Sequence, residues 1–329
     1  MVQFRGLSLY NFLRISLKED PSLQVEPWQV MDYRKLSIQE LLGKMRVLGV
    51  DLKEDHFLSY AESFDTPEEL LECLCVEEED LVSQEKLYLL VLELWRRLLP
   101  EKQSLSIFCD ELDFLISLYD EGILEQEEEG LQKSLSELED VLDRSVDQGA
   151  RPQEIFQMVS SYLAHDLESF LYDYISDLID GNNEVYASEL LDGVIEYVSD
   201  CKWFEFLKSK LFASSNSPEF NALMSRLLEQ AEESPDFSFL FEIAQFLVHR
   251  GETSLFSQCI KQMLPLIKIE GDLLEVLKLI ADFYLCLDQE QEAKEVEQCI
   301  LAREARGLDL SIDSRDVRMV EKLLELSSH

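Results

Sequence analysis

Glycine and proline are scarce in this chain, with 11 and 8 residues among 329. Sandwiches and barrels need frequent turns, and their strands alternate branched apolar side chains with polar ones. We find no run of alternating Val, Ile and Thr flanked by turn residues, whereas leucine recurs at helical spacing. The composition therefore argues against an all-β domain and predicts an all-α fold without a sheet.

The sequence also lacks the spacings that mark disulfide frameworks and metal sites. The number of cysteines, seven, is odd, and no two of them form a C-x-x-C motif. Cys73 and Cys75 would point about 200° apart on a helix, so they would not share a metal. None of the four histidines lies three or four residues from another histidine or a cysteine. We therefore expect reduced core thiols in a cytoplasmic protein and no metal site.

No apolar run approaches the roughly 20 residues of a membrane-spanning helix. Near the start, Arg5, Arg14 and Lys18 interrupt short apolar groups, so the unbroken apolar core of a cleaved secretory signal is missing. We expect a cytoplasmic protein, while a non-cleaved export signal of another kind stays open.

Motifs for enzymes and cofactors are missing as well. The chain contains neither glycine-rich nucleotide motif, no Gly-x-Ser-x-Gly elbow and no twelve-residue calcium loop. Paired carboxylates carry no information here, because 68 residues are acidic. We predict a non-enzymatic protein with no cofactor and infer no small-molecule substrate. An enzyme of unknown type in an all-helical fold is the alternative.

The net charge of −39 is distributed unevenly. Residues 1–60 carry eight basic and eight acidic side chains, whereas residues 61–200 carry 7 basic and 37 acidic ones, a net of −30. Such a field repels phosphate backbones and anionic lipid, so nucleic acid and membrane surfaces are poor partners. A basic protein partner fits better, and simple solubility is an equally good explanation.

Leucine-rich periodic segments separated by short joints predict a series of helices. Thr66 followed by Pro67 and two acids is a strong start signal, and Gly49 is a natural stop. Short joints favour antiparallel neighbours. The helices are expected near residues 7–18, 37–48, 53–63, 66–76, 83–98, 104–119, 131–142, 152–164, 166–180, 184–199, 202–213, 218–233 and 314–326.

The strongest internal punctuation is Asp147-Gln148-Gly149-Ala150-Arg151-Pro152. It predicts an N-terminal helical domain over residues 1–148, acidic from about residue 61, and a C-terminal helical-repeat domain over residues 149–329.

Within residues 237–307, two segments align with each other at a shift of 37 residues. The shift places Ala244 on Ala281 and Leu247 on Tyr284, so each segment has a small and a large residue one helical turn apart. The further pairs are Gly251 with Asp288, Phe256 with Ala293, and Ile260 with Glu297. Each segment therefore predicts a helix–turn–helix pair with one apolar seam.

This pattern resembles the tetratricopeptide repeat, a 34-residue helical pair. Numbering two units from Phe237 and Leu274 places the first four pairs at the family's small, tyrosine, turn-glycine and small positions. The departures are Leu277 where the family prefers tryptophan, Phe256 where it prefers alanine, and Glu297 where it prefers an aromatic residue. Three residues also separate the units. An ordinary helical bundle is the alternative.

The resemblance implies antiparallel hairpins stacked into an α-solenoid-like array, with a concave face that binds a protein or peptide segment. By the same resemblance, the face consists of Ser238, Phe241, Gln245, Val248 and His249 in the first unit, and of Glu275, Lys278, Asp282, Leu285 and Cys286 in the second. Phe241 is the candidate aromatic anchor. Packing in the core is the alternative for it and for its neighbours Phe237 and Phe239.

These features favour a protein–protein interaction scaffold or adaptor. An acidic cytoplasmic protein with tetratricopeptide-like hairpins is also similar to chaperones and regulators of bacterial specialised secretion, which we keep as an alternative. For the enzyme alternative, a deep pocket with a displaced-pKa acid or a His–acid pair would count in favour, and a smooth groove would count against.

Overall fold

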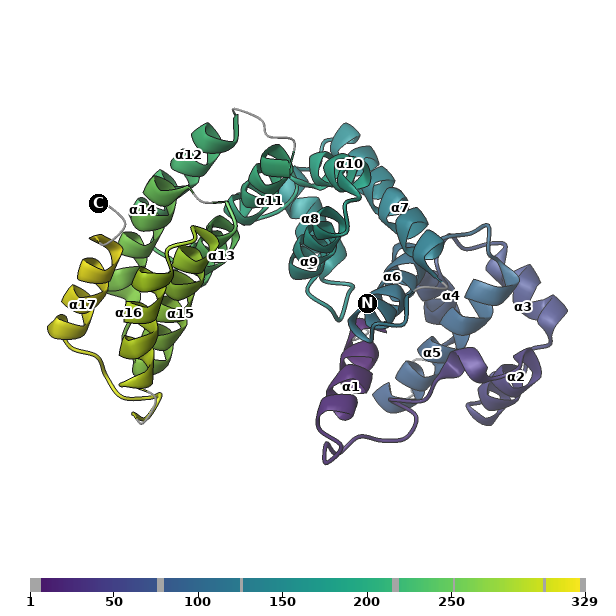
Figure 1. The fold of residues 1–329 in the computed structure, drawn as a ribbon. Helices are drawn as coiled ribbons and strands as arrows, with labels where there is room; N and C mark the ends of the chain where they lie inside the picture. Colours follow the sequence, from purple (N-terminus) through teal and green to yellow (C-terminus); the bar gives the residue numbers. More distant parts are fainter. Residues whose placement is uncertain are drawn as a thin grey trace. The chain divides into compact units, whose positions relative to one another are not determined.

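The computed structural model describes residues 7–75, 80–124, 127–214, 219–250, 252–303 and 306–325. These residues form 17 α-helices and no strand, which confirms the predicted all-α fold (Figure 1). The described residues show one isolated antiparallel bridge, between Ile269 and Ser311.

Of helices α1 to α10, all except α7, α8 and α10 begin and end close to the predicted positions. They are α1 Leu7–Glu19, α2 Ile38–Val47, α3 Glu54–Ala61, α4 Pro67–Leu74, α5 Leu81–Leu98, α6 Leu105–Asp120, α7 Glu128–Asp147, α8 Pro152–Ser160, α9 Leu167–Asp180 and α10 Glu184–Val194, with a 3-10 turn η1 at Tyr33–Lys35. The remaining helices are α11 Cys201–Ser214, α12 Glu219–Glu233, α13 Phe237–Val248, α14 Thr253–Met263, α15 Glu270–Cys286, α16 Glu290–Leu301 and α17 Ser314–Glu325, with a 3-10 turn η3 at Leu264–Leu266.

Local signals in the sequence explain several of these ends. The Ser37 side chain caps α2 in a capping box with Glu40, and Thr66 caps α4 by accepting a hydrogen bond from the backbone of Glu69. Gly49, just past α2, has a φ of +91°, which a side chain would disfavour. The predicted end of α4 near residue 76 lies outside the described residues.

Two helices are shorter than predicted. Helix α8 ends at Ser160 rather than near residue 164, because the following backbone donates to the Asp113 side chain instead of continuing the helix. Helix α10 ends at Val194 rather than near residue 199, and the chain turns so that the Tyr197 hydroxyl donates to Asp143 on α7. In both cases a tertiary contact ends the helix.

The chain divides into two compact units, which we describe separately. Unit 1 comprises Met1–Tyr174 and Asp192–Ser199, and unit 2 comprises Ile175–Leu191 and Asp200–His329. The predicted boundary at residue 149 falls inside unit 1, because α7 and α8 on either side of it pack against each other. The turn at Gly149 therefore joins two neighbouring helices of one unit.

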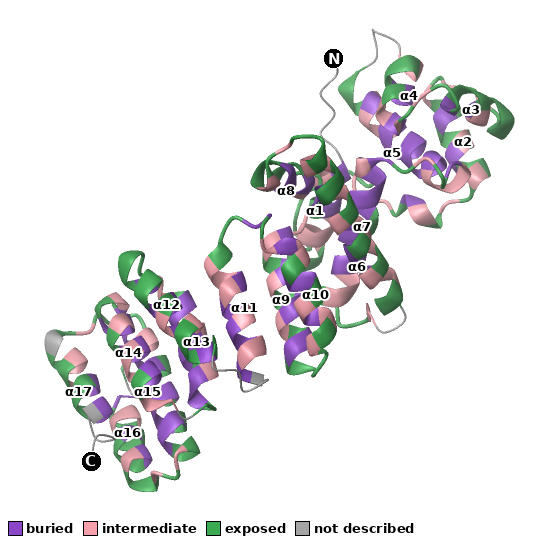
Figure 2. Ribbon diagram, turned by 90° about the horizontal axis from the view of Figure 1, so that it is seen from above, coloured by how far each residue is buried: buried purple, intermediate pink, exposed green. Residues whose placement is uncertain are grey.

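The core of unit 1 surrounds α5. This helix buries ten residues, including Trp95, and packs against α2 and α4 (Figure 2). The Trp95 indole N–H donates to the carbonyl of Lys102, 2.8 Å away, so its polar end is satisfied inside the core. Helix α6 packs against α1 on one side and α7 on the other.

Unit 2 contains three consecutive helical hairpins. Helices α11 and α12, α13 and α14, and α15 and α16 pack in pairs, while α13 also contacts α15 and α12 contacts α14. The small–large seam predicted from the 37-residue shift is buried, since Ala244, Ala281, Leu247 and Tyr284 are all inaccessible to solvent or nearly so. Between α15 and α16 the backbone of Asp288 has a φ of +59°, as suits a tight turn.

Helix α17 packs against α16 and is tied to the start of α15. Arg303, which follows α16, donates to both carboxylate oxygens of Glu270 at 2.5 and 2.8 Å and to Asp316 on α17 at 2.7 Å. Both Arg303 and Glu270 are buried, so this cluster closes the C-terminal end of unit 2 with a satisfied charge pair.

Candidate functional site

Helix α15 is buried on every side except one stripe. Ten of its residues are buried, and the five predicted positions Glu275, Lys278, Asp282, Leu285 and Cys286 are the exposed ones. They follow one another at steps of mostly three or four residues, which keeps them on a single helical face. Leu285 is 47% exposed and gives this stripe an apolar side chain.

On α13 the structure separates the predicted positions. Ser238, Gln245 and His249 are exposed, and Phe241 is half-buried. Val248 does not belong to the open face, because it is only 3% exposed. Leu240, Ala244 and Val248 are spaced four residues apart and so lie on one face of the helix. The side chains of Leu240 and Ala244 are fully buried.

A contact between two of the predicted residues joins α13 to α15. Nδ1 of His249 lies 3.6 Å from Sγ of Cys286, and the two helices pack against each other. The exposed positions of α13 and of α15 therefore form a surface whose two parts meet at this contact. We call it the α13–α15 face, which consists of Ser238, Gln245, His249, Glu275, Lys278, Asp282, Leu285 and Cys286.

The aromatic side chains at the start of α13 divide between core and edge. Phe239 is buried and makes edge-on contacts with Trp203 at 4.9 Å and Phe206 at 6.2 Å between ring centroids. Phe237 and Phe241 stack on each other at 5.9 Å and remain half-buried. Phe239 is thus a core residue, while Phe241 borders the α13–α15 face.

The charges of the α13–α15 face are mixed. Lys278 forms an ion pair of 2.6 Å with Glu275 in the turn before it. Asp282, one turn further on, forms no ion pair with any described residue. The stripe therefore presents a carboxylate beside the exposed Leu285 side chain. This arrangement suits a partner segment that combines an apolar with a basic side chain.

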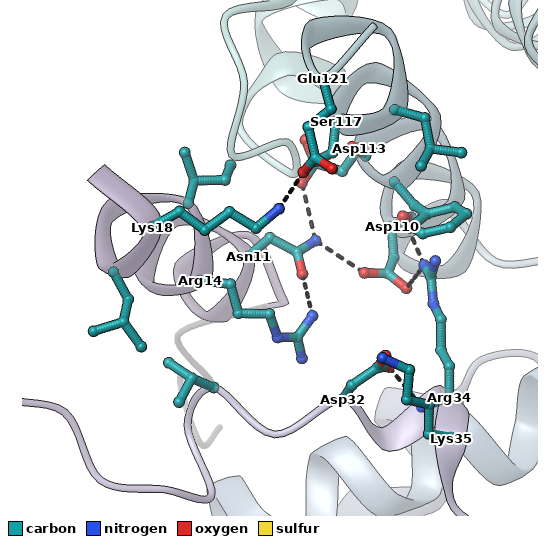
Figure 3. A pocket seen from close by; sticks show the side chains of 15 residues that line it. Asn11, Arg14, Lys18, Asp32, Arg34, Lys35, Asp110, Asp113, Ser117 and Glu121 are labelled. Carbon is teal, nitrogen blue, oxygen red and sulfur yellow. Dashed lines mark hydrogen bonds and ion pairs between the residues drawn. The ribbon is translucent and has the colours of Figure 1, made fainter. Parts of the chain in front are cut away.

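A second feature, in unit 1, is a polar cavity of about 400 Å³ between α1, η1 and α6 (Figure 3). Asn11 at its wall donates from Nδ2 to Asp110 at 2.9 Å and to Asp113 at 3.0 Å. Sequence reasoning did not find this site. The only signal in the sequence was that Asp110 and Asp113 lie within the apolar helix predicted over residues 104–119. No local motif distinguishes these two aspartates from acidic residues on a surface.

The carboxylate of Asp110 forms ion pairs with two arginines, Arg34 and Arg96. Burial acts to raise its pKa, but the charges of Arg96 and Arg34 and the hydrogen bonds from Asn11 and Arg34 together lower it, and the pKa of Asp110 lies below its ordinary value. Arg34 donates to it at 2.6 Å, and Arg96 forms a further direct ion pair. Asp110 is therefore an ionised structural anchor for α5, α6 and η1.

The His–acid pair that would favour an enzyme is present beside this cavity. Nδ1 of His165 lies 2.8 Å from Asp113, and its Nε2 lies 3.4 Å from the Ser117 hydroxyl. The Ser117 hydroxyl, however, donates to the backbone carbonyl of Asp113 at 3.0 Å, and Asp113 also accepts the backbone N–H groups of Ala164 and His165. These contacts fasten the segment before α9 onto α6, which is a structural role.

No family model, no curated protein and no solved structure matched this chain in comparisons with known proteins. Among the described helices, none is both long and apolar enough to cross a membrane. Within the same residues, no three side chains of His, Cys, Asp or Glu are grouped as a metal site would require.

Proposed function

We propose that this protein is a non-enzymatic interaction scaffold that binds a protein or peptide segment on the α13–α15 face. The observation that carries the proposal is the open stripe of α15, joined to α13 through His249 and Cys286. A helix that buries all its other sides and leaves one leucine-bearing stripe uncovered presents a ready docking surface.

The chemistry of the face defines the partner. Leu285 supplies an apolar contact, Asp282 supplies a carboxylate without an ion pair among the described residues, and the chain carries a net charge of −39. In a partner segment with an apolar side chain near a Lys or Arg, the apolar side chain would pack on Leu285 and the basic side chain would pair with Asp282. The overall negative field would also speed the encounter with such a segment.

Two buried thiols support a reducing, cytoplasmic location for this function. Burial raises the pKa of both Cys109 and Cys259, so they stay protonated and pack as small apolar side chains. Core cysteines of this kind are typical of reducing compartments.

Matched leucine variants test the proposal. Leu285 on α15 and Leu301 at the end of α16 are both exposed leucines of the same hairpin, at 47% and 64%, but only Leu285 lies on the α13–α15 face. Tagged wild-type protein, Leu285→Asp and Leu301→Asp would be used to capture proteins from a lysate of cells that produce the chain. Quantitative mass spectrometry would then compare the captured proteins.

We expect a protein that is retained by the wild type and by Leu301→Asp, and reduced at least about tenfold by Leu285→Asp, as for an anchor of ~1.4 kcal/mol or more. Thermal unfolding would show that both variants are folded. Equal retention by Leu285→Asp, or equal loss with both variants, would remove the α13–α15 face as the binding surface.

A further inference from the structure

We infer that the polar cavity of unit 1 is a binding site for a small monocarboxylate with an apolar body, whose carboxylate is held by Arg14. This site lies apart from the α13–α15 face and adds a ligand to a protein proposed above only to bind other proteins.

Four cationic side chains line the cavity, and three of them have a direct acidic partner. Lys18 pairs with Glu121, Lys35 with Asp32 at 3.1 Å, and Arg34 with Asp110 at 2.6 Å, while Asp113 is held by Asn11 and His165. Arg14 has no carboxylate within 4.0 Å among the described residues. In a chain with 68 acidic residues, an arginine without a direct acidic partner beside a cavity indicates that the partner is supplied from outside.

The guanidinium of Arg14 is already held in place for such a partner. Its Nη1 donates to Oδ1 of Asn11 at 2.8 Å (Figure 3). Its Nη2 donates to the carbonyl of Met31 at 3.1 Å. Each of these nitrogens carries two hydrogens, so each keeps one further N–H to donate. A planar fork fixed by two protein acceptors loses little side-chain entropy when it binds a carboxylate.

The guanidinium of Arg14 is partly buried without a direct ion pair in the part of the chain that the structure describes, which is unfavourable, and a bound anion would offset this. Its Nε is buried and has no hydrogen-bond partner among the described residues. Burial lowers the pKa of Arg14, and the more distant Asp110 and Asp32 only partly oppose this. A carboxylate in the cavity would return the missing direct ion pair to the guanidinium.

The rest of the wall selects the kind of anion. Asp32, Asp110, Asp113 and Glu121 line the same cavity, so a doubly charged phosphate would meet four carboxylates, while Arg14 is the one lining cation without a direct acidic partner among the described residues. A single negative charge matches the single unpaired Arg14. Ile15, Val30, Phe114 and Leu118 line the remainder, which favours an apolar body behind the carboxylate. The volume of about 400 Å³ suits a small molecule.

The test uses hexanoate and benzoate as carboxylate probes on the full-length protein. Two-dimensional NMR would follow the Arg14 Nε–H signal and the α1 amides during titration. A ligand of eight or nine heavy atoms in such a site should bind with a Kd on the order of 1 mM. We expect saturable shifts from at least one of the two probes. Hexan-1-ol and inorganic phosphate should give no saturable shift.

Two substitutions at Arg14 and one control separate binding from folding. Arg14→Gln is expected to weaken binding at least about tenfold, and Arg14→Lys, which keeps the charge but loses the fork, about threefold or more. Lys35→Gln, at a cation already paired with Asp32, should bind within about twofold of the wild type. Circular dichroism would verify that every variant is helical.

The inference fails if neither carboxylate gives a saturable shift, if hexan-1-ol binds as tightly as hexanoate, or if Arg14→Lys and Arg14→Gln both bind like the wild type. None of these results bears on the α13–α15 face, which the Leu285→Asp comparison tests separately.

Discussion

His249 at the end of α13 and Cys286 at the end of α15 lie side by side, with Nδ1 and Sγ 3.6 Å apart. They are 37 residues apart in the chain, the same shift at which the two sequence segments align. The second helices of the two hairpins also begin 37 residues apart, at Thr253 and Glu290. The internal alignment therefore corresponds to neighbouring hairpins whose first helices, α13 and α15, pack against each other.

The first prediction is that Phe241 contributes less to stability than the core residue Phe239. Phe239→Ala should lower the free energy of unfolding by ~3–5 kcal/mol, because that ring is fully packed. Phe241→Ala should cost only ~1–2 kcal/mol, because the ring is half-buried and contacts Phe237 at its edge. Urea unfolding monitored by circular dichroism would compare the two. Equal losses would place Phe241 in the core and leave it unavailable to a partner.

A second prediction concerns the buried charge cluster of unit 2. Arg303→Met should destabilise the protein by ~3–5 kcal/mol, because it leaves the buried Glu270 without its bidentate partner. The control is Lys294→Met, which breaks an exposed ion pair with Glu290 and should cost less than ~1 kcal/mol. Denaturant unfolding measures both. A loss for Arg303→Met no larger than that for the control would contradict the structural role of the cluster.

The third prediction is a pH dependence at Asp110. Its pKa is depressed in the folded protein, so the carboxylate stabilises the fold above its unfolded pKa of about 3.9 and loses this contribution as the pH falls through the folded value. Asp110→Asn should therefore be less stable than the wild type at pH 7. The difference should shrink as the pH is lowered below about 4. Unfolding midpoints measured at matched pH for both proteins test this, and a constant difference would show that Asp110 is not ionised in the fold.

A fourth prediction follows from the acidic charge of the chain. If a partner binds through a basic segment, its affinity should fall by on the order of tenfold between about 0.05 M and 0.5 M NaCl, because salt screens exposed charges. Isothermal titration calorimetry with the captured partner measures the slope. An affinity that does not change with salt would mean that the net charge of −39 serves solubility rather than recognition.

The helices were predictable from the sequence because their signals are local. Capping at Ser37 and Thr66 and the left-handed glycine at position 49 each act within a few residues. The five positions on α15 were predicted through the resemblance to the tetratricopeptide repeat, and all five side chains are exposed. The prediction that Val248 is exposed was wrong, because Val248 lies in the buried row of α13 with Leu240 and Ala244. Which rows of a helix are buried depends on how the neighbouring hairpin packs against it.

The polar cavity could not be predicted in this way. Asn11 contacts Asp110 and Asp113 across separations of 99 and 102 residues, and no local spacing encodes such a meeting. The same holds for the ends of α8 and α10, which long-range contacts of Asp113 and Asp143 shorten. Sequence periodicity locates helices and their buried sides, but the polar contacts between distant helices appear only in the folded chain.

Site-specific photocrosslinking tests the central claim most directly. Benzoylphenylalanine would replace either Asp282, on the open stripe of α15, or Gln298, exposed on α16 of the same hairpin. Irradiation in cells that produce the protein should yield a covalent adduct with a second polypeptide from position 282 and none from position 298. Adducts from position 298 alone, or equal yields from both positions, would contradict the assignment of the α13–α15 face as the binding surface.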